Sequence, residues 1–283
     1  MKWEELNTKD FEVAVKKCQG VCIVPLGIIE KHGPHSPLGT DLLNIRKIAT
    51  LAAEREPAIV FPAYYFTQIY EGQHCAGTIA TKPKLLIELL ENVCDEISRN
   101  NLQKIILLNG HGGNISLLQF FLQTMLYRRK DYIVYLCNNS WSNPEMRKVN
   151  EKILEETEIF HAGEWETSLT LANCPHLVKM DYVPKEPSIS LNRLKHLSQQ
   201  HLLTSIDWHA SYPDHYGGDA RLATKEKGEK ILEYLVGYVT KVIKTVKEDK
   251  VAKELYDEFI SRINEKRGEE RISERIKLKP EGR

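Results

Sequence analysis

The chain has 283 residues, 42% of them hydrophobic, and its 39 basic and 39 acidic residues give a formal net charge of zero. This length suits one large domain or two small ones, and the balanced charge offers no field that would attract nucleic acid or a strongly charged protein partner. No apolar stretch approaches the roughly 18 residues needed to span a bilayer, and the charged N-terminus, Met1 to Glu5, does not resemble a signal peptide.

The cysteines predict the compartment. Six of them are scattered at positions 18, 22, 75, 94, 137 and 174, without a CxxC pair. Several lie inside apolar runs, so we expect buried, reduced thiols. We therefore predict a cytoplasmic protein. The balanced charge and the lack of a long apolar stretch predict neither a nucleic-acid nor a membrane partner.

Predicted strands and helices alternate through the first 160 residues. Apolar runs predict strands at 21–26, 58–63, 104–109 and 132–137. Amphipathic patterns predict helices at 9–18, 41–54, 81–99, 115–127 and 145–156. Such alternation is typical of a parallel sheet with helices on both faces. The continuously apolar run from Ile105 to Leu108 fits a parallel strand that is buried on both sides.

The rest of the chain is less regular. A short helix is expected after the segment 161–168, residues 174–222 show little periodicity apart from a helical pattern at 191–203, and a further helix is predicted at 224–246. From residue 247 onward the chain is highly charged, which favours a solvated helix. We thus expect one α/β domain over 1–246 and a charged, helical extension over 247–283.

The loop at 27–41 carries the strongest functional signal. It follows a predicted strand, it contains three glycines and two prolines, and it holds the carboxylates Glu30 and Asp41 and the imidazoles His32 and His35. A mixed oxygen and nitrogen set suits zinc, manganese or iron(II). Glu30 and His32 point the same way on an extended segment. Asp41 begins a helix, where the dipole favours a carboxylate, and its two oxygens can bridge two ions. The role of His35 stays open.

A glycine-rich turn, Asn109 to Asn114, follows the third predicted strand and allows two interpretations. Glycines before a helix N-terminus can cradle an anion with their backbone amides, but the lysine and hydroxyl of a nucleotide-binding loop are missing. Alternatively, His111 is a metal ligand on a tight turn, and the amides of Gly112 and Gly113 are available to a substrate oxygen. The flanking glycines favour this second interpretation.

A third cluster, His161-Ala162-Gly163-Glu164-Trp165-Glu166, adds an imidazole and two carboxylates. It is either an ordinary acidic first turn of a helix or a source of one ligand and a proton donor, His161. On a helix the two glutamates lie about 200° apart, so one of them faces the site, and which one stays open.

Other residues carry weaker signals. Trp141, Trp208 and His209 either line a substrate pocket or pack in the core, and the role of His74 stays open. The histidines at positions 176, 196, 201 and 215 receive no predicted role.

Together, these motifs resemble the creatininase (creatinine amidohydrolase) family over about residues 18–240. They are Glu30-x-His32-Gly33-x-His35 with Pro37-Leu38-Gly39-Thr40-Asp41, then Asn109-Gly110-His111-Gly112-Gly113-Asn114, then His161-Ala162-Gly163-x-x-Glu166-Thr167-Ser168. The resemblance implies a three-layer α/β/α sandwich with a mainly parallel sheet and a homo-oligomer, often a hexamer. It further implies two divalent metal ions per subunit, which would be zinc, manganese or iron, with zinc favoured. It also implies roles for six residues: Glu30, His32, Asp41, His111 and Glu166 as metal ligands, with Asp41 bridging, and His161 as the acid/base.

One departure bears on the substrate. Creatininases proper tend to carry a glutamate where this chain has Gly113, which argues against creatinine itself and makes Glu166 the candidate for the remaining ligand. The predicted function is hydrolysis of a carbonyl in a small polar, cyclic substrate, a cyclic amide or formamide, by a metal-bridging hydroxide. The alternatives are hydrolytic C–C ring opening of a cyclic diketone such as an inositol-derived one, a non-catalytic metal-binding protein, and an anion- or nucleotide-binding enzyme built on the glycine turn.

Overall fold

A four-stranded, fully parallel sheet forms the centre of the computed structural model. The structure describes residues 1–138, 143–156 and 159–277, and it describes side chains up to residue 266. The strand order is β2-β1-β3-β4. The strands are β1 (Val21–Leu26), β2 (Ile59–Val60), β3 (Lys104–Asn109) and β4 (Ile133–Cys137). The prediction of 58–63 for the second strand was too long. Phe61 still donates to the Ile23 carbonyl, but Pro62 has no N–H with which to continue the ladder.

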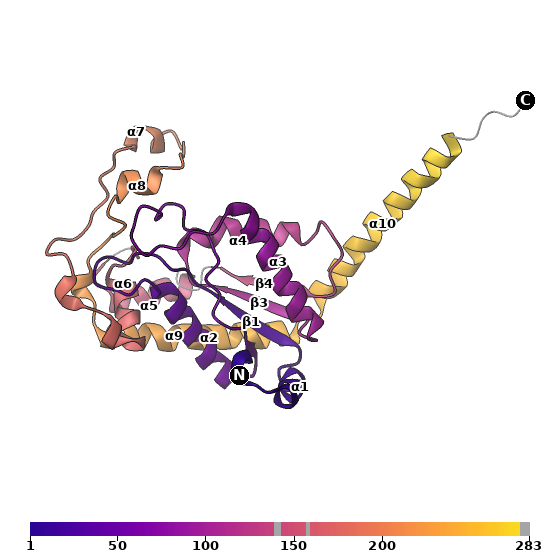
Figure 1. Ribbon diagram of the computed structural model, residues 1–283, viewed down its shortest axis with the longest axis horizontal. Coiled ribbons are helices and arrows are strands. Elements are labelled where there is room, and N and C mark those ends of the chain that lie inside the picture. The colour runs from indigo at the N-terminus through magenta and orange to yellow at the C-terminus, as the bar shows by residue number, and fades with distance from the viewer. Residues whose placement is uncertain (139–142, 157–158, 278–283) are drawn as a thin grey trace, which may run out of the picture.

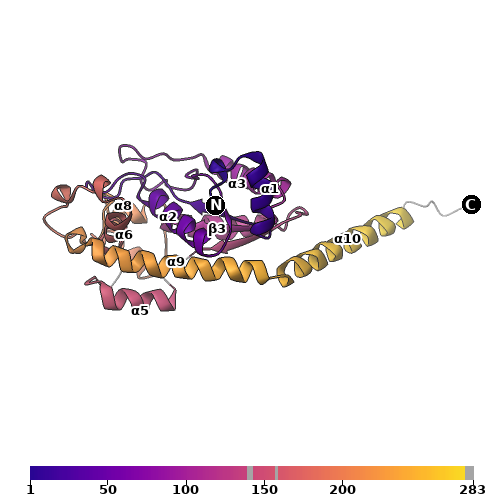
Figure 2. The same ribbon diagram turned by 90° about the horizontal axis from the view of Figure 1, so that it is seen from below.

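Helices cover both faces of this sheet (Figures 1 and 2). One face packs against α1 (Thr8–Lys17), α3 (Pro83–Arg99) and α4 (Ile115–Thr124), and the other against α2 (Thr40–Arg55), α6 (Glu164–Asn173) and α9 (Lys225–Glu248). Successive residues of β1 show why: Val21 and Ile23 join the core beneath α2 and α9, whereas Cys22 and Val24 join the core beneath α1 and α3. The predicted three-layer α/β/α sandwich with a parallel sheet is confirmed.

The remaining helical elements connect or extend these layers. They are α5 (Pro144–Ile153), α7 (Lys195–Ser198), α8 (Asp207–Ser211) and the 3-10 turns η1 (Trp3–Glu5), η2 (Gly112–Asn114), η3 (Pro175–Leu177), η4 (Met180–Tyr182) and η5 (Ala220–Leu222). The predicted helix at 191–203 was wrong except for the four residues of α7. Asn192 and His201 adopt left-handed backbone conformations on either side of α7, which a continuous helix excludes.

The charged C-terminal region contains a further long helix among its described residues. After Glu248 the chain begins α10 (Val251–Lys277), which projects away from the body of the molecule (Figures 1 and 2). Lys104 links this corner to the sheet by donating to the carbonyls of Val246, Lys247 and Asp249. Among the residues that the structure describes, no helix combines the length and the apolar character that crossing a membrane requires.

Two glycines allow α2 to pass close over the ends of the central strands. Leu26 of β1 lies beside Asn109 of β3, so the loops that follow both strands leave the sheet at the same edge. A Cβ atom at Gly27 would lie 2.4 Å from the Leu42 Cα, and one at Gly110 would lie 2.6 Å from the Ile45 Cβ. Only glycine permits this approach, which brings the first turn of α2 to the edge where ligands bind in such folds.

Candidate metal centre

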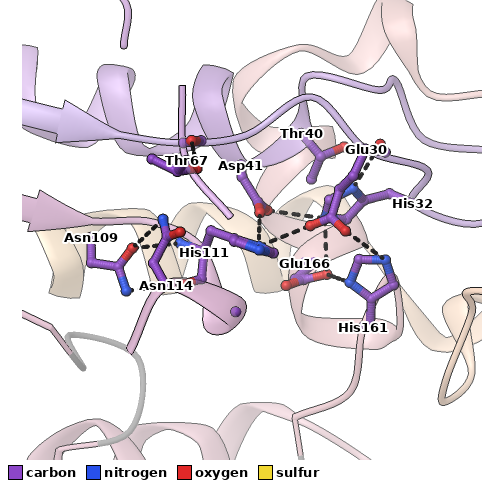
Figure 3. Close-up of polar contacts among 12 residues, drawn as sticks. Glu30, His32, Thr40, Asp41, Thr67, Asn109, His111, Asn114, His161 and Glu166 are labelled. Atoms are coloured by element: carbon purple, nitrogen blue, oxygen red, sulfur yellow. Dashed lines mark hydrogen bonds and ion pairs between the residues drawn. The ribbon is translucent and has the colours of Figure 1, made fainter. Parts of the chain in front are cut away.

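Asp41, in the first turn of α2, joins two groups of possible metal ligands (Figure 3). Its Oδ2 lies 2.9 Å from His111 Nδ1, and that nitrogen lies 2.9 Å from Glu30 Oε1. Its Oδ1 lies 3.0 Å from His32 Nε2, and that nitrogen lies 3.6 Å from Glu166 Oε2. The ligand atoms of Glu30, Asp41 and His111 all lie within 4.8 Å of one another, and so do those of His32, Asp41 and Glu166. Thus five predicted ligands from three distant segments converge.

Burial and charge pairing set the protonation of this cluster. Burial alone would lower the pKa of His32, but the carboxylates of Asp41, Glu166 and Glu30 together outweigh burial and raise the pKa of His32 to about 10. Burial is likewise outweighed at His111, where Glu30 and Asp41 hold the pKa well above its ordinary value. The pKa values of Glu30 and Asp41 are lowered against the effect of burial by the facing histidines. Without metal, the cluster therefore holds imidazolium protons between carboxylates.

The polar atoms at the centre of the cluster fit metal ions better than they fit one another. Glu30 Oε1 and His32 Nε2 are buried, and no described residue gives either of them a hydrogen bond of acceptable geometry, although opposite charges lie close by. Buried polar atoms without partners are costly. A set of carboxylate oxygens and imidazole nitrogens suits zinc or manganese. The residues present therefore fit two divalent ions that share Asp41.

Glu166, and not Glu164, faces this cluster. The Glu166 carboxylate accepts a hydrogen bond from the Ala162 amide at 2.6 Å, and burial raises its pKa to about 7. Ala162 adopts φ +60°, a strained conformation for a residue with a Cβ, at the turn that places this amide. Glu164 is fully buried elsewhere, where its carboxylate accepts from the amides of residues 155 and 156 and pairs with Lys227.

His161 lies beside the cluster, and its two ring nitrogens have different surroundings. Its Nε2 is 2.7 Å from the Lys31 carbonyl oxygen, and because a carbonyl only accepts, Nε2 carries the hydrogen. The lone pair is then on Nδ1, which lies 4.0 Å from Glu166 Oε2. Burial and the neighbouring His32 lower the pKa of His161 to about 3, so the ring is neutral at pH 7. It is thus placed to accept a proton and to pass it on.

His215, which received no role from the sequence, contacts a predicted ligand. Its Nε2 lies 2.7 Å from Glu30 Oε2, and the Trp208 indole donates to its Nδ1 at 2.8 Å. Because the indole N–H only donates, Nδ1 accepts and Nε2 carries the hydrogen toward Glu30. The available signal was a histidine close to the glycine pair Gly217-Gly218, in a segment without periodicity.

A cavity of about 390 Å³ opens onto the cluster. The residues that line it include His161, Glu166 and the predicted substrate-binding residues Gly112, Gly113 and Trp208. The apolar side chains of Ile48, Leu169 and Leu235 also line it. His209, also predicted to bind substrate, is not among the described residues that line this cavity; its ring lies 5.1 Å from the ring of His74. Trp141, the remaining prediction, lies outside the described residues.

Two further histidines, His35 and His74, form hydrogen bonds with residues outside the cluster. His35 is buried, and its Nε2 lies 2.9 Å from the Thr167 hydroxyl. His74 Nε2 lies 2.8 Å from the Pro213 carbonyl oxygen, and that carbonyl accepts its hydrogen. Neither belongs to a group of converging ligand atoms in the described part of the chain.

Comparisons with known proteins agree with the fold and the motifs. The family model described as creatinine amidohydrolase (creatininase) matches residues 4–243. Creatinine amidohydrolase of Pseudomonas putida is 26% identical over 253 residues, which cover 85% of this chain and 95% of the relative. The 3-dehydro-scyllo-inosose hydrolase of Thermotoga maritima is 27% identical over 266 residues, which cover 87% and 83%.

Solved structures give the same answer. A manganese form of creatininase superposes with a TM-score of 0.72 at 25% identity, covering 88% of this chain and 99% of the other. A creatininase variant of the Zn–Zn type superposes equally well, with a TM-score of 0.72 at 25% identity over 88% of this chain and 98% of the other. The family predicted from the three motifs is confirmed: this chain belongs to the creatininase family.

Proposed function

We propose that this chain is a metal-dependent hydrolase that cleaves a C–N bond at the carbonyl of a small substrate such as a cyclic amide or a formamide. The observation that carries the proposal is that Asp41 belongs to two groups of converging ligand atoms. One group contains Glu30 and His111, and the other contains His32 and Glu166. Relatives that are named as hydrolases of small substrates support the same reaction class.

In this proposal the five residues of the cluster hold two divalent ions. Ions bound there would supply an activated water and would polarise the substrate carbonyl. The protein contributes a dry, preorganised setting, because Glu30 and His32 are fully buried and Asp41 and His111 are almost so. His215 donates to Glu30 and thereby orients that carboxylate, which is the task of an outer partner of a metal ligand.

His161 would move the proton that the reaction requires. Its neutral ring has an acceptor at Nδ1, near Glu166, and the Lys31 carbonyl fixes the ring orientation through Nε2. It would accept a proton as the nucleophile forms and return it to the leaving nitrogen as the C–N bond breaks. The backbone amides of Gly112 and Gly113, which line the cavity, are available to the carbonyl oxygen.

A second candidate reaction is hydrolytic C–C cleavage of a cyclic diketone. The favouring observation is the Thermotoga maritima inosose hydrolase, whose match covers 87% of this chain. Both reactions start with water attacking a carbonyl, so the same cluster serves either one. They differ in the atom that leaves and hence in the substrate that the cavity must recognise.

A turnover screen with metal-analysed protein tests the proposal. The purified chain, loaded with zinc or manganese, would be incubated with cyclic amides, formamides and cyclic diketones, and compared with protein stripped by a chelator. We expect turnover of at least one class by the loaded protein and none by the stripped protein. Equal turnover by both preparations would contradict the proposal. We also propose that the protein is cytoplasmic and that it forms a homo-oligomer, with a hexamer as the favoured state.

A further inference from the structure

Glu71 is a carboxylate of the cavity that the metal cluster does not use. It lies in the segment between β2 and α3, it is half-buried, and it lines the same cavity as His111, Gly112 and Gly113. Its ligand atoms do not belong to any of the converging groups that hold Glu30, Asp41 and Glu166 in the described part of the chain. Its place at the wall of the cavity therefore requires another explanation.

The position of Glu71 is built into the structure. The backbone of Gln68, three residues earlier, makes two contacts with the glycine turn. Its carbonyl oxygen accepts from His111 Nε2 at 3.0 Å, and its backbone N–H donates to Asn114 Oδ1 at 3.2 Å. The Gln68 side-chain oxygen accepts from the Tyr70 amide at 2.8 Å. These bonds tie the segment that carries Glu71 to the glycine turn, so its carboxylate is held beside the cluster instead of on a free loop.

Gly113 leaves the room that Glu71 occupies. A Cβ atom at position 113 would lie 2.5 Å from His111 Nε2 and 3.1 Å from Glu71 Oε1. Any side chain at this position would therefore displace the imidazole and crowd the carboxylate. The glycine turn thus does two things: it lets His111 reach the cluster, and it lets the carboxylate of Glu71 approach the cavity from a different segment.

Among the described residues, neither a lysine nor an arginine pairs with Glu71. Its polar contact among the described residues is the neutral Gln68 side-chain amide, which donates to Oε1 at 3.3 Å. The described residues that line the cavity include four carboxylates but neither lysine nor arginine. Three of these carboxylates, those of Glu30, Asp41 and Glu166, face the histidines of the cluster. A half-buried carboxylate at a cavity wall that no described lysine or arginine lines is suited to receive a cationic group from a ligand.

We propose that Glu71 is a specificity-determining residue, whose carboxylate binds a cationic hydrogen-bond donor, such as an amino group, on the substrate whose carbonyl lies at the metal cluster. This inference rests on the proposed function, since it places the carbonyl at the ions. It narrows the substrate class to small carbonyl compounds that carry a positively charged nitrogen group, and it makes anionic substrates poor ligands.

Hydroxamates test this proposal without a known substrate, because the hydroxamate group binds metal ions directly. The probes are the hydroxamates of glycine, β-alanine and γ-aminobutyric acid, each compared with the methyl-ended hydroxamate of equal length. Calorimetry on the metal-loaded chain would give the ratio of the two affinities at each length. In the best-fitting pair, Glu71→Gln should lower the preference for the amino compound by about tenfold or more, as expected for a lost charge-assisted hydrogen bond.

A matched variant separates a local effect from a change in net charge. Glu88→Gln makes the same substitution at an exposed position on α3 and should leave the affinity ratio unchanged. Melting temperature and metal content, measured on both variants and on Glu71→Ala, show that each one is folded and loaded. The methyl-ended hydroxamates should bind all variants equally.

The outcomes distinguish this inference from the proposed function. If the methyl-ended hydroxamates bind but no amino preference exists, or the preference survives in Glu71→Gln and Glu71→Ala, the role of Glu71 is wrong and the metal centre stands. If the Glu71 variants lose metal, Glu71 is a ligand and not a recognition residue. If no hydroxamate binds the metal-loaded chain, the proposed function itself fails.

Discussion

Asp41 Oδ2 lies 2.9 Å from His111 Nδ1, although 70 positions separate the two residues along the chain. The contact exists because parallel strands β1 and β3 end at the same edge and because Gly27 and Gly110 let α2 pass over that edge. The two groups of ligand atoms share Asp41 at this contact, and the account of the function depends on it.

The two glutamates at the start of α6 are predicted to behave differently. Glu166→Gln removes a carboxylate from the cluster and should weaken metal binding by more than the roughly 10–100-fold that loss of an outer partner causes. Glu164→Gln should leave metal binding intact and lower the free energy of unfolding by about 1.5–3 kcal/mol, because a fully buried, charged acceptor of Lys227 is lost. Metal titration and urea unfolding of both variants measure these effects; the opposite pattern would reverse their assignment.

His161 is predicted to act in the reaction and not in metal binding. His161→Ala should keep its metal content and lower kcat by about 10²–10⁴-fold once a substrate is known, because the imidazole that accepts and returns the proton is lost. The control is metal content of the same preparation. Turnover equal to that of the unmodified chain would remove His161 from the mechanism.

His215 is predicted to support metal binding through Glu30. His215→Ala removes the hydrogen bond to Glu30 Oε2 and should lower metal affinity by about 10–100-fold. Trp208→Phe removes the indole that fixes the imidazole tautomer and should cause a smaller loss in the same direction. Competition with a metal-sensitive dye measures both affinities. A metal affinity unaffected by His215→Ala would show that the hydrogen bond between His215 and Glu30 does not support metal binding.

Metal binding is predicted to release protons. Without metal, the pKa of His32 is raised to about 10 and that of His111 lies well above its usual value, so both imidazoles are protonated at pH 7. A ligating imidazole must be neutral, so each bound ion competes with a proton. The apparent affinity should therefore rise with pH below about 10, by up to about 100-fold per pH unit where two protons are displaced.

Calorimetry in buffers of different ionisation enthalpy counts those protons directly. At pH 7 we expect about two protons from His32 and His111 and a fraction of one from Glu166, whose pKa is about 7, to be released when the cluster fills. The same titration of His32→Ala should release about one fewer. A binding enthalpy that is the same in every buffer would show that the histidines are already neutral, and the charge pairing described for the cluster would be wrong.

Much of the site could be predicted because its residues follow strand ends. The apolar runs before Gly27 and Gly110 identify β1 and β3 with the bounds that the structure shows, and parallel strands end at one edge. From this it follows that Glu30, His32 and His111 gather there. Asp41 joins them because the helix after the loop begins at the same edge.

Other parts of the site depend on tertiary contacts that periodicity does not report. His215 lies in the aperiodic segment 174–222, and its place beside Glu30 depends on Trp208, seven residues earlier. Glu164 and Glu166 occupy one helical turn, and the contacts of Glu164 with Lys227 on α9 and with the amides of residues 155 and 156 show that Glu164 turns away. Glu71 lies at the cavity wall because hydrogen bonds hold Gln68 against the glycine turn. None of these contacts leaves a local pattern.

Anomalous diffraction from crystals of the zinc-loaded chain tests the central claim most directly, with Asp41→Asn as the matched variant. We expect two zinc peaks in the unmodified chain, one among Glu30, Asp41 and His111 and the other among His32, Asp41 and Glu166, and loss of both peaks in the variant. Zinc bound only at sites away from Asp41, or two peaks that persist in Asp41→Asn, would contradict the account.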